Sequence, residues 1–382
     1  MNEPEHEPRT VNPDLRTSSC SWLHGCNYPW STDGATIFYG LDFGGNLWGS
    51  HLGVSTRRAA VARDFARMAA LGFTVARWFV FCDGRSGIVY DAAGMPAGVD
   101  SHLVDDLDSA LEIARDAGMQ VDFVLLDHRW MFGGVRETFA DPASGVLLEA
   151  RLPEGRARVL LTEPGQNALF EHVLEPVIRR YGSSGVRSDL AGQVAFWEFM
   201  NEPDFVVDEW EQDVSRHVRS PLPFATLADL VARLSDVVHT HTTAFTTLGG
   251  ARARNLWAWD DDALGLDVVQ VHQYPDRNHA EFDDNLFGVP SHELAIRKPV
   301  LIGEFPGDPM RQHPPNVAPV PIALDDYLEF ALTQGYLGAW PWSFSGTDEF
   351  GALPVEPLVR FAAKHPDVVN ARCALTRSRS DA

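Results

Sequence analysis

Cysteine, positive charge and long apolar runs are all scarce in this chain of 382 residues. The four cysteines, Cys20, Cys26, Cys82 and Cys373, form no CxxC pair and have no metal-ligand spacing. A disulfide between Cys20 and Cys26 stays open, although unpaired thiols are the interpretation that we favour. The cysteines therefore indicate neither a zinc site nor a disulfide framework, and we expect no bound metal.

Positive charge is too sparse for a protein that binds nucleic acid. The chain carries 53 acidic residues against 31 basic ones, which gives a net charge of −22. A protein that binds a phosphate backbone needs a positive stripe that displaces counterions. We therefore expect no nucleic-acid partner, and the charge balance suits a neutral substrate.

A membrane span and an export signal are also missing from the sequence. No apolar run reaches the roughly 20 residues that a transmembrane helix requires. The polar, acidic start MNEPEHEPRTVNPD has neither a basic segment nor the apolar segment of a signal peptide. We expect no membrane partner and a cytoplasmic location, or secretion if a signal has been removed.

What the sequence does contain is a regular α/β alternation. Residues 1–20 and 374–382 are polar and aperiodic, so we expect two flexible tails around a single domain over residues 21–373. Within this domain a short apolar run, a loop and a helical pattern recur eight times. Near-continuous apolar runs are typical of strands that are covered on both faces. The predicted strands are 24–28, 74–81, 120–127, 193–200, 244–248, 266–273, 299–305 and 336–343.

Amphipathic helical patterns separate most of these strands. Apolar residues recur at helical spacing within 55–71 and 101–117, and Gly72 and Gly118 stand where a glycine ends a helix. The patterns at 166–181, 226–242 and 320–334 are similar. The fifth and sixth helices are the weakest, because irregular segments such as 276–290 can replace full helices there.

Eight β/α units favour either a closed barrel or a doubly wound sheet. No GxGxxG motif follows the first strand, and GLDFGGNLWG lacks the Lys and Ser/Thr of a phosphate-binding loop. We therefore predict a single (β/α)8 TIM barrel with long loops after the strands. The loops 29–54, 82–100, 129–165 and 202–225 all follow strands, on the face where such barrels build active sites.

Two glutamates stand at strand ends on that face. Glu202 follows the fourth strand in FWEFMNEPD, and Glu304 ends the seventh in PVLIGEFPGD. A carboxylate after a hydrophobic strand is costly unless it has a task. Hydrolysis of a glycosidic bond needs two carboxyl groups that face each other. One gives a proton to the leaving oxygen, and the other, as a carboxylate, stabilises the positive charge that develops on the sugar. Glu198 and Glu209 are rivals to Glu202, and we expect Glu198 to lie deeper and to be structural.

These residues resemble glycoside hydrolase family 5, the cellulase- and β-mannanase-like family of retaining (β/α)8 glycosidases. Asn201–Glu202–Pro203 is similar to its acid/base motif, and Glu304 in GEF is similar to its nucleophile. The resemblance implies further site residues at other strand ends and covers about residues 24–365. These are Arg77 in VARWF beside the nucleophile, His272 and Tyr274 in VHQYPD, and Trp342 in WPWSF beneath the cleaved sugar.

The third strand departs from the family pattern. The family often has a histidine at the end of the third strand. His128 in LLDHRWM is the nearest match, although its alignment with that position can shift by one residue. His128 either contacts the substrate or is a polar residue satisfied at the strand end. Among the many tryptophans near the strand ends, Trp342 is the expected sugar contact, with Trp30, Trp48 and Trp130 as weaker candidates.

The resemblance implies a retaining β-glycoside hydrolase that needs no cofactor and cleaves β-linked oligo- or polysaccharides, either β-mannosides or β-glucosides. Glu202 must be protonated and Glu304 ionised, the latter held by Arg77 and Tyr274, and the Asn201 amide is expected to bind the sugar 2-hydroxyl. The carboxyl carbons are expected roughly 5–5.5 Å apart. The alternative is a catalytically silent carbohydrate-binding barrel. A metal-dependent hydrolase lacks its histidine ligands, and a serine hydrolase lacks its GxSxG motif.

Overall fold

The computed structural model describes most of the predicted domain. The described residues are 22–33, 37–47, 49–132, 136–140, 147–151, 156–210, 221–274, 286, 289–308, 323–346 and 351–369. Both predicted tails, 1–20 and 374–382, lie outside them, as do Cys20, Trp48 and Cys373. Cys26 and Cys82 are free, buried thiols.

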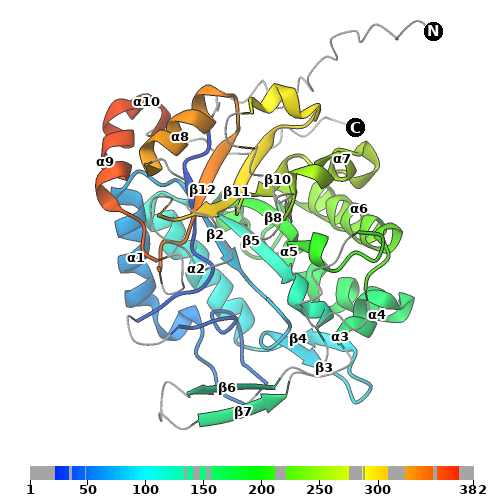
Figure 1. Ribbon diagram of the computed structural model, residues 1–382. Coiled ribbons are helices and arrows are strands. Elements are labelled where there is room, and N and C mark those ends of the chain that lie inside the picture. Colours follow the sequence, from blue (N-terminus) through cyan, green and yellow to red (C-terminus); the bar gives the residue numbers. More distant parts are fainter. Residues whose placement is uncertain are drawn as a thin grey trace, which may run out of the picture.

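Eight parallel strands form the barrel that the sequence predicts, in chain order around it (Figure 1). Each predicted strand is present, and the third has the predicted bounds. Backbone hydrogen bonds join the first and last strands, from Leu23 to Leu337 at 2.7 Å and from Phe344 to Asn27 at 2.8 Å. The barrel strands are β1 (Gly25–Asn27), β2 (Val75–Phe79), β5 (Gln120–Asp127), β8 (Val194–Asn201), β9 (Phe245–Gly250), β10 (Val269–His272), β11 (Val300–Pro306) and β12 (Gly338–Trp342).

Helices surround these strands, as Figure 1 shows. They are α1 (Arg58–Ala70), α2 (Leu103–Ala117), α3 (Arg156–Leu161), α4 (Glu163–Leu169), α5 (Glu175–Arg180), α6 (Phe224–His241), α7 (Leu256–Trp259), α8 (Leu324–Thr333), α9 (Val355–Lys364) and α10 (Pro366–Val369). None of the helices in the described ranges is long and apolar enough to cross a membrane.

The weak helix signals after the fifth and sixth strands correspond to short elements. After β9 the chain forms the four-residue α7 between two 3-10 turns, Ala253–Asn255 and Asp262–Leu264, and the described part after β10 holds a 3-10 turn, Ser291–Leu294. The predicted helix 166–181 is present but is interrupted by a π-helical turn, Phe170–Leu174, before Pro176. Proline has no amide hydrogen to donate, so the regular hydrogen-bond pattern cannot continue through it.

Two antiparallel hairpins stand in the predicted loops 82–100 and 129–165. The first joins β3 (Ile88–Tyr90) to β4 (Pro96–Val99), and the second joins β6 (Arg136–Ala140) to β7 (Leu147–Arg151). Both lie at the lower end of the molecule in Figure 1. They were not predicted from the sequence, in which both segments read as irregular loops.

The barrel interior is built in layers because alternate residues of a strand face the same side. One layer is apolar and comprises Val75, Phe196, Phe245, Val268, Leu301 and Trp340. Two residues further along the strands the layer is polar, with Arg77, Asp122, Glu198 and Gln270, all buried. Beyond it lie Phe79, Val124 and Trp342. A charged layer thus lies between apolar ones, directly beneath the strand ends.

Candidate active site

An extra residue precedes each of the two predicted catalytic glutamates. Between β8 and β9, Glu198 pairs with Thr247 and Asn201 with Gly249, so three steps on β8 oppose two on β9. Between β10 and β11, Val271 pairs with Ile302 and His272 with Glu304, so two steps on β11 oppose one on β10. Such bulges re-aim the side chains that follow them. Both glutamates are turned in this way towards the same point of the barrel.

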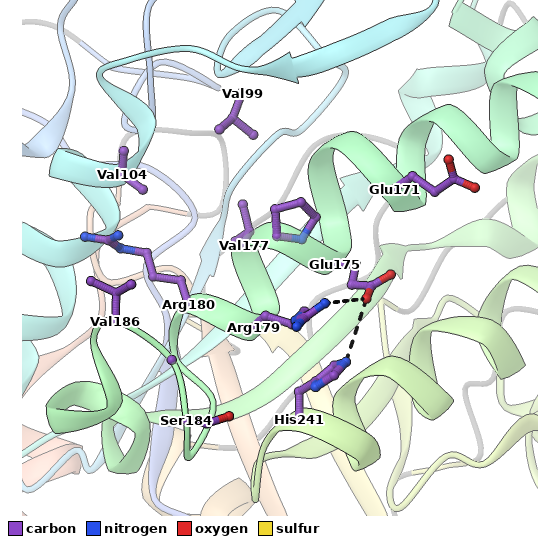
Figure 2. Close-up of a pocket in the computed structure, with 12 residues that line it drawn as sticks. Val99, Val104, Glu171, Glu175, Val177, Arg179, Arg180, Ser184, Val186 and His241 are labelled. Carbon is purple, nitrogen blue, oxygen red and sulfur yellow. Dashed lines mark hydrogen bonds and ion pairs between the residues drawn. The ribbon is translucent and has the colours of Figure 1, made fainter.

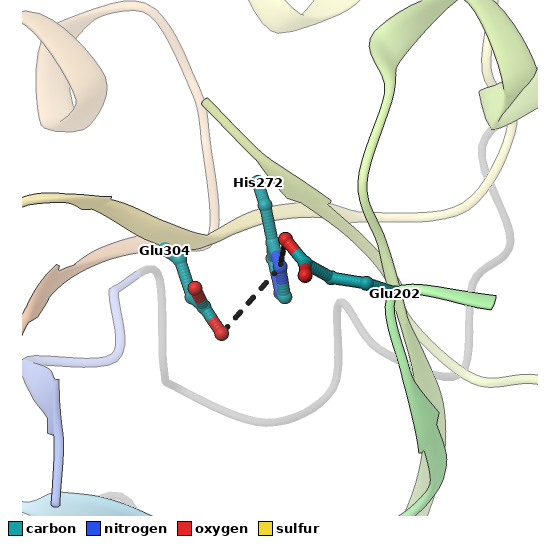
Figure 3. Close-up of side chains that lie close together, drawn as sticks. All are labelled: Glu202, His272 and Glu304. Carbon is teal, nitrogen blue, oxygen red and sulfur yellow. Dashed lines mark hydrogen bonds and ion pairs between the residues drawn. The ribbon is translucent and has the colours of Figure 1, made fainter. Parts of the chain in front are cut away.

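Glu202 and Glu304 face each other across the imidazole of His272 (Figure 3). One oxygen of each carboxylate and the histidine nitrogen all lie within 4.8 Å of one another. The Nδ1 atom of His272 is 3.3 Å from Glu202 and 3.5 Å from Glu304. Glu202 keeps 15% of its side chain exposed, against 5% for Glu304, so Glu202 is the more accessible to a leaving group or a water molecule.

Arg77 connects Glu304 to the buried polar layer. Its guanidinium donates two hydrogen bonds to Glu198, at 2.8 and 2.6 Å, and one to Glu304 at 2.5 Å. The same group donates to Asn27 at 2.9 Å and to Asn201 at 2.8 Å. Arg77 and Glu198 are both fully buried. Glu198 therefore lies deep and pairs with Arg77, in keeping with the structural part that we expected of it.

Tyr274 completes the surroundings of Glu304. Its hydroxyl donates to the second carboxylate oxygen of Glu304 at 3.0 Å, while Arg77 donates to the first. Below, the term glutamate cluster denotes Glu202 and Glu304 with the four polar side chains gathered around them, Arg77, Asn201, His272 and Tyr274. The structure thus brings together six of the eight predicted site residues in direct contact.

Burial dominates the electrostatics of Glu304. Removal from water raises the pKa of its carboxyl group, the charges of His272 and Arg77 oppose that rise, and the charge of Glu202 adds to it. Below the cluster, burial and the charge of Glu198 raise the pKa of Asp122 well above its usual range. In the same buried layer Arg77 and Glu198 form an ion pair with a nitrogen–oxygen distance of 2.6 Å.

The seventh predicted residue, His128, does not end its strand. Strand β5 ends at Asp127, which pairs in register with Asn201, and His128 begins the following 3-10 turn, His128–Met131. Its Nδ1 atom is 3.7 Å from a Glu202 oxygen, and its ring packs edge-on against Phe132 and Phe205. His128 therefore lies one residue beyond the strand end and beside Glu202.

The eighth predicted residue, Trp342, packs beside the cluster in the apolar layer that includes Tyr274. Its ring lies edge-on to Trp30 and Phe79, with centroids 5.7 and 6.1 Å away. Trp130 is fully buried and donates its indole hydrogen to the Arg156 carbonyl, so it cannot contact a sugar. Trp30 stays partly exposed beside Trp342, and Trp48 lies outside the described residues.

Sequence reasoning missed Asp127, which contacts the cluster. One of its oxygens accepts a hydrogen bond from the Asn201 amide at 2.9 Å. The only signal was its place at the end of the predicted strand 120–127, next to the predicted site residue His128. The rival Glu209 is exposed and accepts a hydrogen bond from the backbone of Phe224 at the start of α6, outside the cluster.

Glu202, His272 and Glu304 are also close enough together to supply three ligand atoms to a cation. The Arg77 guanidinium already lies 2.5 Å from Glu304, however, and would repel a cation bound there. The arrangement suits acid–base chemistry better than metal binding.

A separate pocket of about 600 Å³ lies away from these residues, against α5 and the end of α6 (Figure 2). Its lining includes Val99, Val177 and an ion pair in which Glu175 lies 3.3 Å from Arg179 and 3.8 Å from His241. No predicted site residue lines it.

Two curated proteins resemble the chain in sequence, although no family model matches it. A mannan endo-1,4-beta-mannosidase of Mytilus edulis is 22% identical over 352 residues, which are 84% of this chain and 83% of that protein. Mannan endo-1,4-beta-mannosidase 1 of Oryza sativa subsp. japonica is 24% identical over 272 residues, 65% of this chain and 60% of that protein. These similarities confirm the resemblance to mannanase-like family 5 enzymes and the prediction of a glycoside hydrolase.

Solved structures resemble the fold over nearly its whole length. A beta-1,4-D-mannanase from Cryptopygus antarcticus superposes with a TM-score of 0.67 at 18% identity and covers 90% of both chains. The beta-mannanase of the blue mussel Mytilus edulis superposes with a TM-score of 0.65 at 18% identity, over 94% of this chain and 93% of that one. The predicted (β/α)8 barrel is thereby confirmed.

Proposed function

We propose that this glycoside hydrolase cleaves β-1,4-linked mannosides with retention of the anomeric configuration. Support for the substrate class comes from the two curated relatives, both named as mannan endo-1,4-beta-mannosidases. The observation that carries the mechanism is the approach of Glu202 and Glu304, whose nearest oxygens are at most 4.8 Å apart. Retaining enzymes have their carboxyl groups about 5–5.5 Å apart and inverting ones roughly 6.5–9.5 Å apart, so two carboxylates whose nearest oxygens approach this closely favour the retaining arrangement.

The contacts of the two carboxylates favour different roles. Two carboxylates this close titrate as a pair and retain one proton between them over a range of pH. Arg77 and Tyr274 both donate to Glu304, which stabilises the ionised form of that group. The shared proton therefore belongs on Glu202, the more exposed of the two.

In the first step a Glu304 oxygen attacks the anomeric carbon while Glu202 gives its proton to the leaving glycosidic oxygen. The products are a covalent mannosyl–Glu304 ester and a free sugar hydroxyl. In the second step Glu202, now ionised, takes a proton from water as the water oxygen attacks the same carbon and Glu304 departs. Two inversions at one carbon give net retention.

Azide separates the two roles. In Glu304→Ala the nucleophile is missing, so azide occupying its place should restore turnover and yield the mannosyl azide of inverted configuration. In Glu202→Ala the proton donor is missing, so dinitrophenyl mannoside should still form the ester while natural linkages lose a factor of about 10²–10⁴. Added azide ion should then attack this ester and yield the mannosyl azide of retained configuration.

Glu209→Ala serves as the matched control, because Glu209 is an exposed glutamate on the same face that caps α6. It should hydrolyse both substrates at the wild-type rate. Opposite configurations of the two azide products would reverse the roles. A wild-type protein without activity on β-mannosides, β-glucosides and mannan would instead favour the carbohydrate-binding barrel.

A further inference from the structure

Asp127 holds Asn201 from the neighbouring strand. It is the last residue of β5 and pairs in register with Asn201, the last residue of β8. Its Oδ2 atom accepts a hydrogen bond from the Asn201 amide nitrogen at 2.9 Å, and its Oδ1 atom accepts one from the backbone of Arg129 at 2.9 Å. Asp127 is 5% exposed, so both bonds are shielded from water. The backbone contact fixes the carboxylate and leaves its other oxygen for Asn201.

The amide of Asn201 can face only one way between its two partners. Its oxygen accepts from Arg77 at 2.8 Å while its nitrogen donates to Asp127. A flipped amide would set its NH₂ group against the Arg77 guanidinium and its oxygen against the Asp127 carboxylate. The flip would then set donor against donor and acceptor against acceptor, and both hydrogen bonds would be lost. The nitrogen therefore keeps its second hydrogen for a substrate that enters beside Glu202.

We propose that Asp127 is a positioning residue that holds the Asn201 amide ready for the 2-hydroxyl of the bound sugar. The 2-hydroxyl is on the carbon next to the reacting anomeric carbon, so a donor held in place for it acts close to the charge that develops in the transition state. Because the Asn201 N–H is aimed before the substrate arrives, it can strengthen its bond to that hydroxyl in the transition state at little reorganisation cost. This inference rests on the proposed function, since it adds a positioning residue to that same site.

A substrate without the 2-hydroxyl isolates the contribution of Asp127. We would measure kcat/KM of wild type, Asp127→Ala and Asp127→Asn on matched aryl β-mannoside, β-glucoside and 2-deoxy glycoside. Asp127→Ala should lose about tenfold to a hundredfold on the mannoside, the size of one charge-assisted hydrogen bond. On the 2-deoxy glycoside its loss should stay within about threefold.

The asparagine variant guards against a misfolded alanine variant. Its side chain has nearly the shape of aspartate and can still offer a carbonyl oxygen to Asn201, so its loss on the mannoside should lie between those of wild type and Asp127→Ala. Asp83→Asn is the control, because Asp83 is an equally buried aspartate after β2 that instead pairs with Arg85 at 2.8 Å. Any loss in that variant should be the same on the mannoside and on the 2-deoxy glycoside.

The outcomes separate the inference from the function beneath it. If Asp127→Ala and Asp127→Asn each lose the same factor on the mannoside and on the 2-deoxy glycoside, Asp127 only supports the fold and the inference is wrong, while the enzyme remains a mannosidase. If wild type hydrolyses none of the three glycosides, the proposed function itself fails.

Discussion

At the scale of single residues, the Tyr274 hydroxyl is the contact whose loss has the clearest signature. It donates to the ionised form of Glu304, so Tyr274→Phe destabilises that form and raises the pKa of the carboxyl group further. The acid limb of kcat/KM, below which Glu304 is protonated and inactive, should move to higher pH by about one unit. The alkaline limb, where Glu202 loses its proton, should move much less.

The control is Tyr336→Phe, since the Tyr336 hydroxyl also donates a hydrogen bond, but to the Val289 carbonyl at 2.8 Å, away from the glutamate cluster. The acid limb of kcat/KM against pH in Tyr336→Phe should match that of the wild-type enzyme. An acid limb that stays in place or moves to lower pH in Tyr274→Phe would show that Glu304 does not control it.

Residue identities at the strand ends were predictable from the sequence, but the contacts between them were not. Glu202 and Glu304 stand out because each follows an apolar strand with a recognisable neighbour sequence. Asp127 has no such sequence signal, since its role depends on the register between β5 and β8, which pairs it with Asn201. For the same reason the sequence did not decide whether His128 stands at the end of the third strand.

At the scale of elements, the glutamate cluster depends on a strand that contributes almost no side chain to it. Gly249 of β9 lies where a Cβ atom would be 2.5 Å from Glu198 and 3.0 Å from the Arg77 guanidinium. Its carbonyl also accepts the backbone hydrogen bond of Glu202 at 2.7 Å. Gly249→Ala should therefore displace the Arg77–Glu198 pair, lower stability by about 1–3 kcal/mol and reduce kcat/KM on mannosides.

Urea unfolding and kinetics on one aryl mannoside measure both effects. Gly192→Ala is the matched control, because a Cβ atom at Gly192 meets nothing within 4 Å. It should keep wild-type activity. Equal behaviour of the two variants would mean that the charged layer tolerates an added methyl group.

Strands were predicted better than the elements that follow them. The runs at 120–127 and 193–200 predicted β5 and β8 to within a residue, because strands covered on both faces have near-continuous apolar sequences. The hairpins β3–β4 and β6–β7 were not foreseen, since strands of three to five residues carry weak sequence patterns. The π-helical turn before Pro176 was not foreseen either, because its apolar spacing is close to that of a regular helix.

At the scale of the whole molecule, buried carboxyl groups and the net charge of −22 act in the same direction. Burial raises the pKa of Asp122, Asp204 and Glu304, so the folded protein binds more protons than the unfolded chain above the ordinary carboxyl pKa of about 4. Stability should consequently fall as pH rises from that value through the folded-state pKa values of these groups. The growing negative charge adds to the fall.

The opposite sign applies below pH 4. Neighbouring arginines lower the pKa of Asp83 and Asp108, so the stability that their ion pairs contribute is lost when these groups are protonated. The melting temperature should therefore peak on the acid side of neutrality. Thermal unfolding from pH 3 to 9 tests this, and Asp122→Asn, whose side chain cannot ionise, should flatten the alkaline slope. A peak above pH 8 would contradict the assignment.

The backbone of Glu202 has a consequence for how this protein can evolve. The residue adopts φ 50° and ψ 48°, a left-handed conformation that glycine occupies freely and glutamate does not. A conformation of this kind works against stability, so drift towards a more stable fold would favour glycine at this position. On the proposed mechanism the carboxyl group of Glu202 is needed for hydrolysis, so the position trades stability for activity.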